Sequence, residues 1–465
     1  MTHFSHRIPC KSLLVLQLVL YMFLANPIKS FALGPDNGKS GSGIAGEPLT
    51  REDERPPLPG ELPKAESKKK FYLLASVNAF LTFSQLVGES NIIGGSASAA
   101  LAPVVRFNDN LFFIGLYDGA YKKSKQVFAE DRGPRLSSEN TRHSFTPTLR
   151  YVVSPRIVTN FAVFATRSLS RETTDENWYG GLYDYNEQGA SITLNYLVTA
   201  AAASQKSVKF LLQRFKREYP NYNALLIECA DASCALTVPI AGREENEKDT
   251  YGTTLSLTYN SLKSAGLSYS ATFSYIFKDY VDKLIETDDC LPPPSICFRG
   301  RNKQRDDIFG ANVTFVLRPG AEFDYHLTMS TEIKQSNQNF TEGSFPGIVF
   351  HKDYFSYVKL GLAPGFTYSY AFSNTARLVL GAAYSVSRLE YDNRKARDGL
   401  GVVSGIKEID WTHSLNVSAM YSINKRWSFG GIIDYSVARS NNKDERTFRY
   451  SYEIFNFSLG FAYKY

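Results

Sequence analysis

The sequence lacks the short motifs that mark the common catalytic and redox sites. It contains no GxSxG, HExxH, GxxxxGK[ST] or CxxC pattern, and it has 6 histidines and 5 cysteines among 465 residues. These absences exclude the nucleophile elbow, the helical zinc site, the phosphate-binding loop and the dithiol redox pair. His326 stands near Asp324 and Glu322, but the sequence assigns no nucleophile to that group. We therefore expect no enzymatic activity and no cofactor.

The sequence also lacks a strong excess of one charge. The formal net charge is +6, with 43% hydrophobic and 14% aromatic residues. This balance excludes a disordered chain and a polytopic helical membrane protein, and it gives nucleic-acid binding no electrostatic support. The aromatic residues are mainly Phe and Tyr, with 32 and 29 copies, and this usage favours strands over helices.

Residues 1–32 have the pattern of a secretory signal peptide. Arg7 and Lys11 precede an apolar run from Leu13 to Ala25, and the small residues Ser30 and Ala32 follow at the spacing of a cleavage site. The alternative, a retained anchor helix, needs roughly 20 apolar residues, which is more than this run offers. We expect cleavage and export.

Export leaves four cysteines in two close pairs, Cys229 with Cys234 and Cys290 with Cys297. In an oxidising compartment this pattern predicts two local disulfides, each closing a loop. A metal site is the alternative, but both spacings are wider than CxxC and no histidine lies nearby in the sequence. We therefore expect no metal.

Residues 33–70 are rich in Pro, Gly and Ser and contain no aromatic residue. Such a segment cannot form a hydrophobic core, so the sequence predicts a disordered periplasmic tether. Two roles stay open for it: a passive extension, or a plug or docking arm for a periplasmic partner.

From Phe71 to the end of the chain, apolar residues alternate with small or polar ones. The alternating segments are longer than the strands of soluble sandwiches, aromatic residues gather near their ends, and short turns alternate with long polar connections. These features predict an all-β fold, a transmembrane antiparallel β-barrel over residues 71–465. Sixteen strands fit best and fourteen next, because a closed bacterial barrel with both ends in the periplasm needs an even number.

Two parts of this strand pattern are incomplete. Only fifteen strands are recognisable, so one strand that runs from the periplasmic to the extracellular side is missing. We expect it around Tyr222–Ile227 or Ala235–Ile240. Residues 204–219 follow a helical period instead, with basic residues on the other face, and predict an amphipathic helix at the periplasmic mouth. The apolar positions of that helix are Val208, Leu211, Leu212, Phe215 and Tyr219.

The end of the chain resembles the closing strand of a Gram-negative outer-membrane β-barrel of the porin-like class. The residues that carry the resemblance alternate and end on an aromatic residue: Phe457, Leu459, Phe461, Tyr463 and Tyr465. The resemblance covers about residues 71–465. It implies location in the outer membrane, contact with outer-membrane lipid and lipopolysaccharide, and recognition of the last strand by the barrel-assembly machinery.

If the apolar register faces lipid, the opposite register faces a hydrated lumen of Ser, Thr, Gly, Asn and Ala. Opposed acids and bases there would bias which solutes pass; alternatively, they pair and stiffen the wall. The candidate luminal charges are Arg150, Arg318, Glu322, Asp324, Glu332, Lys334, Lys359, Arg377, Asp410 and Asp434.

Two functions remain open on the sequence. The first is a porin-like channel for passive passage of small hydrophilic solutes. The second is a non-transporting surface, adhesive or export-assembly protein of the outer membrane.

Overall fold

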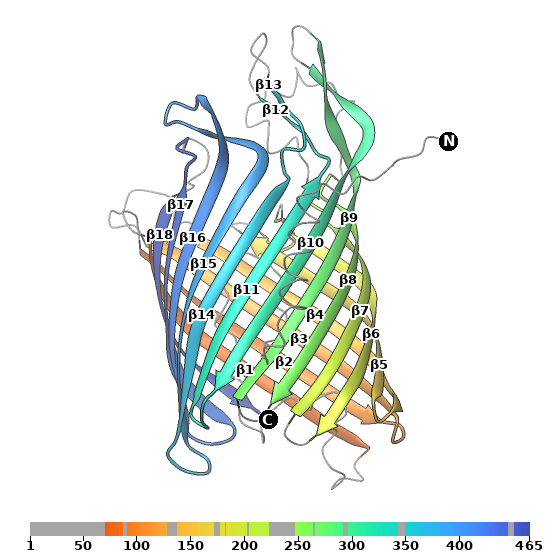
Figure 1. Cartoon of the computed structure of the whole chain (residues 1–465), viewed down its shortest axis with the longest axis vertical. Coiled ribbons are helices and arrows are strands. Elements are labelled where there is room, and N and C mark those ends of the chain that lie inside the picture. The colour runs from red at the N-terminus through yellow and green to blue at the C-terminus, as the bar shows by residue number, and fades with distance from the viewer. Residues whose placement is uncertain are drawn as a thin grey trace.

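The computed structural model describes residues 70–86, 91–127, 137–171, 177–181, 183–201, 204–222, 247–263, 266–291, 296–342, 349–444 and 451–465. Sixteen strands form one closed antiparallel barrel, and two short strands form a separate hairpin (Figure 1). This confirms the expected all-β barrel of sixteen strands. Within these residues, no helix is long and apolar enough to cross a bilayer. The barrel strands are β1 (Phe71–Leu86), β2 (Asn91–Arg106), β3 (Leu111–Val127), β4 (Ser137–Ser154), β5 (Ile157–Arg171), β6 (Tyr185–Ala201), β7 (Ser204–Glu218), β8 (Thr250–Lys263), β9 (Gly266–Leu291), β10 (Ile296–Arg318), β11 (Phe323–Ser336), β14 (Tyr357–Ala371), β15 (Arg377–Arg397), β16 (Val403–Ser422), β17 (Trp427–Ser440) and β18 (Tyr452–Lys464).

Each barrel strand pairs with its sequence neighbours, and β1 closes the ring against β18. At this seam the Tyr465 N–H donates to the Ala75 carbonyl oxygen at 2.8 Å, so both ends of the barrel lie at the same rim. The short turns, such as the one at 155–156, also lie at this rim, and the long connections lie at the other. In outer-membrane barrels the rim of short turns faces the periplasm. We call the two rims periplasmic and extracellular.

The outer wall of the barrel is apolar and exposed. Leu81 and Leu459 are register partners across the closing seam and are 66% and 52% exposed. Large apolar residues at such exposure are unfavourable in water and favourable in hydrocarbon. The outer wall therefore has the surface that a lipid bilayer requires.

Residues 204–218 form strand β7, so the predicted helix at 204–219 was wrong. The strand hydrogen-bonds along its length to β6 and β8. Its outward register has a short apolar stretch, Val208, Phe210 and Leu212, between basic residues. Its luminal register also holds apolar residues, Leu211 and Phe215, so both faces contribute to an apparent helical period.

The sixteenth strand therefore lies earlier in the chain than expected. Apart from Tyr222, which is not in a strand, the ranges Tyr222–Ile227 and Ala235–Ile240 lie outside the described residues. The closed ring holds sixteen strands without them. The expected signal peptide at 1–32, nearly all of the tether at 33–70, and Cys229 with Cys234 also lie outside the described residues.

Two features stand above the extracellular rim. Strands β9 and β10 are longer than their neighbours and continue past the barrel as a hairpin, and β12 (Phe340–Glu342) pairs with β13 (Val349–His351) beside it (Figure 1). Cys290 and Cys297 are register partners near the end of the β9–β10 hairpin. Their backbones lie opposite each other, and the disulfide itself stays a prediction.

Candidate functional site: the luminal wall

Small hydroxyl side chains line much of the barrel interior. Thr258 hydrogen-bonds to Thr272 at 3.0 Å across β8 and β9, and Thr314 to Thr328 at 3.1 Å across β10 and β11. Similar pairs join Thr82 to Ser458 and Ser414 to Ser436. Because each hydroxyl finds its partner on the neighbouring strand, the side chains lie along the wall and leave the interior polar.

The backbone register places nine of the ten candidate charges on the luminal side, and Glu322 in the turn between β10 and β11. Two of them form an ion pair: Arg318 Nε lies 3.1 Å from Asp324 Oδ1. Lys359 is the register partner of Glu332. Lys334 lies on β11 with Glu332. The other four lie on separate strands: Arg150 on β4, Arg377 on β15, Asp410 on β16 and Asp434 on β17.

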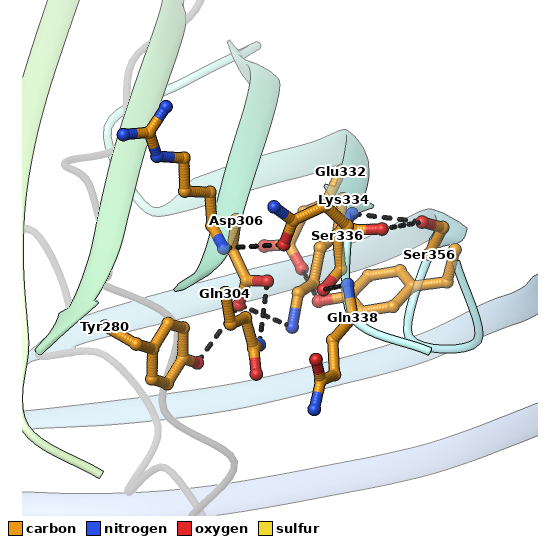
Figure 2. A network of polar contacts seen from close by, with 11 residues as sticks. Tyr280, Gln304, Asp306, Glu332, Lys334, Ser336, Gln338 and Ser356 are labelled. Carbon is orange, nitrogen blue, oxygen red and sulfur yellow. Dashed lines mark hydrogen bonds and ion pairs between the residues drawn. The ribbon is translucent and has the colours of Figure 1, made fainter. Parts of the chain in front are cut away.

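A polar network joins the wall strands β9, β10, β11 and β14 (Figure 2). Its centre is Asp306, which is 1% exposed and lies 2.9 Å from Lys334 Nζ. The Tyr280 hydroxyl and the Gln304 amide each donate to Asp306 at 3.1 Å. A buried carboxylate is stable when it is paired and hydrogen-bonded in this way.

The network continues from β11 to β14. The Tyr357 hydroxyl donates to Glu332 Oε1 at 2.6 Å, and the Ser356 hydroxyl donates to the Ser336 carbonyl at 3.2 Å (Figure 2). Glu332 and Lys334, two residues apart on β11, therefore belong to one network: Glu332 contacts β14 and Lys334 contacts β10. In this sector the luminal charges fix the wall and the start of the β11–β14 connection.

Sequence reasoning missed several luminal charges in this part of the barrel. Asp306 belongs to the network above, and Arg217 of β7 binds Glu187 of β6, with Nε 2.7 Å from Oε2. Lys209 on β7 also falls in the luminal register. Asp306 and Glu187 could have been recognised as luminal, because each alternates with outward residues along its strand. Arg217 and Lys209 were hidden by the helical interpretation of 204–219.

Some luminal charges form no ion pair with any residue that the structure describes. The cations among them include Arg142 and Arg150 on β4, Lys209 on β7, Lys359 on β14 and Arg377 on β15; the acids include Asp410 on β16 and Asp434 on β17. In the closed strand order, β7 and β17 stand half a ring apart. Lys209 and Asp434 therefore occupy opposite walls of the lumen, whereas Arg377 stands on β15, next to the strand that carries Asp410.

The extracellular mouth is held by contacts between two connections. The Lys248 ammonium lies 4.2 Å from the Tyr183 ring centroid and 4.3 Å from that of Tyr222, which places a cation between two aromatic rings. Burial lowers the pKa of Lys248, and nearby Lys283 lowers it further. Asp249 accepts the Tyr219 N–H at 2.7 Å, and burial raises the pKa of this carboxyl. These contacts join the β5–β6 and β7–β8 connections.

Three of the described histidines pack against the barrel wall. His326 lies against the wall at Gly365, where a Cβ would clash with its ring. His143 and His413 belong to the outward register and hydrogen-bond to tyrosine hydroxyls at 2.8 and 2.6 Å. Among the described residues, no three His, Cys, Asp or Glu side chains are grouped to hold a metal ion.

No family model and no curated protein matches this sequence. Solved structures that resemble it are outer-membrane proteins. OmpT of Vibrio cholerae is 11% identical, with 85% of this chain and 100% of that chain covered and a TM-score of 0.41. OccK8 (OprE) of Pseudomonas aeruginosa is 8% identical, with 84% and 98% covered and a TM-score of 0.40. OpdO of Pseudomonas aeruginosa is 10% identical, with 85% and 97% covered and a TM-score of 0.40. Similarities this low carry no statement about the activity of this chain.

Proposed function

We propose that the protein is an outer-membrane channel through which small hydrophilic solutes pass passively. The observation that carries the proposal is the exposure of side chains in the luminal register. Arg142, Ser330 and Lys359 point inward from three different strands, and all three are exposed. An inward side chain is exposed where the interior is open rather than packed.

The size of the barrel supports the same function. An eight-stranded barrel is wide enough only for its own side chains or one small ligand, whereas barrels of sixteen to eighteen strands leave an aqueous channel. Here sixteen strands enclose an interior whose hydroxyl groups bind one another along the wall. A hydrated lumen of this kind suits sugars, amino acids and small ions better than apolar solutes.

The uncompensated charges would give this channel a preference among solutes. Lys209 on one wall and Asp434 on the opposite wall create a transverse field, which orients dipolar solutes and acts on ions of each sign. The ion pairs Asp306 with Lys334 and Arg217 with Glu187 contribute little to that field, because their charges cancel locally. Both roles expected for the luminal charges, selectivity and stiffening, therefore apply to different residues.

A surface function is the second candidate, and the β9–β10 hairpin favours it. This hairpin continues beyond the rim beside the small β12–β13 sheet, where it presents strand edges outside the barrel (Figure 1). Exposed strand edges can pair with another chain. A surface protein of this kind need not conduct.

Planar-bilayer recording of the purified full-length protein tests the channel. We expect stepwise conductance. For a matched pair, Lys359→Cys and Leu360→Cys place a thiol on adjacent residues that face the lumen and the lipid respectively. A bulky hydrophilic thiol reagent should reduce the conductance of Lys359→Cys and leave that of Leu360→Cys unchanged. The wild-type protein with the same reagent controls for its native cysteines.

Two results would contradict the channel. One is absence of conductance both with and without residues 33–70, in protein whose barrel is shown to be folded by its heat-dependent gel mobility. The other is an equal response of the two cysteine variants to the reagent. In either case the surface function would become the better account.

A further inference from the structure

One sector of the outer wall carries exposed cations where an apolar surface is expected. Elsewhere on the outward register, cations at the extracellular end are paired: Arg305 Nε lies 2.8 Å from Asp279, and Arg439 binds Glu453. Arg167 on β5 and Arg214 on β7 are exposed and form no ion pair with any residue in the described ranges. Charges facing hydrocarbon are unfavourable, so these two need another partner.

Both cations lie at the upper boundary of the lipid-facing wall. Arg167 is four residues before the extracellular end of β5, and Arg214 is four residues before that of β7. On the same outward registers, Phe161 and Val163 precede Arg167, and Phe210 precedes Arg214; all three are exposed apolar residues. The cations therefore stand where acyl chains end and lipid headgroups begin.

A hollow in the outer wall adjoins Arg167. It has a volume of about 430 Å³, and its lining includes Tyr117, His143, Phe145, Arg167 and Gln188, which all face outward from β3 to β6. The hollow forms where the wall carries a small side chain, because Ala165 lies between Val163 and Arg167 on the outward face of β5. The hollow is thus polar at its upper edge and apolar below.

The polar side chains of the hollow are held in place. The Arg167 guanidinium lies 4.5 Å from the Tyr179 ring centroid, and His143 hydrogen-bonds to the Tyr117 hydroxyl at 2.8 Å. Glu218 also lines the hollow, but it is neutralised by its ion pair with Lys216. Arg167 is therefore the charge that the hollow presents to a ligand.

We propose that this hollow and the two arginines bind the phosphorylated headgroup of an outer-leaflet glycolipid. Guanidinium groups bind phosphate oxygens through paired charge-assisted hydrogen bonds, and the apolar strip below would receive acyl chains. Strand β6 separates β5 from β7, and the register partners of Arg167 and Arg214 on β6 are Asn186 and Ala190, four residues apart. The two arginine backbones are therefore roughly 16 Å apart, and their long side chains would contact separate phosphates of one headgroup. This inference depends on the outer-membrane orientation of the proposed function and does not depend on conduction.

The test measures glycolipid bound to the full-length protein purified from outer membranes in mild detergent. Native mass spectrometry should show a bound phosphorylated glycolipid on the wild type and about tenfold less on Arg167→Gln combined with Arg214→Gln. Arg439→Gln is the matched control, because it removes an outward cation at the same rim that already has an acidic partner. It should retain the lipid. Arg167→Lys keeps the charge and should retain part of the binding, which separates ligand loss from misfolding.

Titration of delipidated protein identifies the source of the phosphate. Bisphosphorylated lipid A should bind at least tenfold more tightly than the same lipid without phosphates, and more tightly than inorganic phosphate. The proposal fails if the dephosphorylated lipid binds equally well, if inorganic phosphate alone accounts for the affinity, or if Arg439→Gln loses as much lipid as the double variant. Conductance of the double variant is recorded in parallel, so failure of lipid binding and failure of the channel are distinguished.

Discussion

Asp306 of β10 and Lys334 of β11 form a buried ion pair on the luminal wall, with Oδ2 and Nζ 2.9 Å apart. The Asp306 side chain is 2% exposed and that of Lys334 is 17% exposed, although both belong to a register that faces an open interior. The hydroxyl of Tyr280 and the amide of Gln304 complete the coordination of the carboxylate. This part of the wall is therefore packed like the core of a soluble protein.

Asp306→Ala should destabilise the barrel by roughly 3 kcal/mol, because removing one partner leaves the Lys334 ammonium buried without its counterion. Urea unfolding in lipid or detergent, followed by tryptophan fluorescence, measures the change. Combining Asp306→Ala with Lys334→Met should recover much of the loss, since the uncompensated charge is then absent. A double variant as unstable as the sum of the two single variants would show that the pair is not the stabilising contact.

Lys209 and Asp434 should set the ion preference of the proposed channel from opposite walls. A unit charge acts on an ion about 8 Å away with roughly 0.5 kcal/mol in water, and salt weakens this further. Lys209→Glu should therefore raise the cation-to-anion permeability ratio by about three- to fivefold, and Asp434→Asn should lower it by a smaller factor. The reversal potential in a salt gradient measures both.

Lys206 provides the control for this measurement. It lies on β7 three residues before Lys209, but it belongs to the outward register. Lys206→Gln should leave the reversal potential unchanged. If Lys206→Gln moved it as far as Lys209→Glu does, the luminal position of Lys209 would not be the cause.

Alternation in the sequence was sufficient to predict most of the fold and the side of the wall on which a residue lies. The last strand shows why: Phe457, Leu459 and Phe461 all face outward, and every second residue between them is small or polar. A single dominant apolar face fixes the strand register, because a slip of one residue would turn that face into the lumen. The same rule placed Asp410 and Asp434 among the luminal residues.

Strand β7 could not be identified by this rule. Its luminal residue Phe215 is as apolar as its outward residue Phe210, so the strand has no single apolar face. The reason that Phe215 can face the lumen lies on other strands: its register partners are Gly189 on β6 and Gly252 on β8. Both glycines are distant from Phe215 in the sequence, so the sequence alone does not show that they leave room for its ring. The charge partners were hidden likewise, since Arg217 reaches Glu187 only after β6 and β7 pair.

Gly252 should be essential for the packing of Phe215. A Cβ at Gly252 would clash with the Phe215 ring, so Gly252→Ala should destabilise the barrel by about 1–3 kcal/mol in thermal unfolding. Gly320→Ala is the control: a Cβ there meets no atom within 4 Å, and its effect should be close to zero. Adding Phe215→Ala to Gly252→Ala should cause less further loss than Phe215→Ala alone causes in the wild type. Simple additivity of the two changes would contradict the clash.

Phe461 should contribute to assembly through its outward contacts with β17 rather than through the lumen. Its ring lies 5.9 Å from Trp427 and 6.3 Å from Phe429, both on the neighbouring strand β17. Phe461→Ala removes these aromatic contacts and should destabilise the barrel by about 1 kcal/mol or somewhat more. The folded fraction in outer membranes, measured by heat-dependent gel mobility, should fall with it. Ala462→Ser changes the adjacent luminal residue and should leave the folded fraction unchanged; an equal loss in both variants would mean that any change in the last strand impairs assembly.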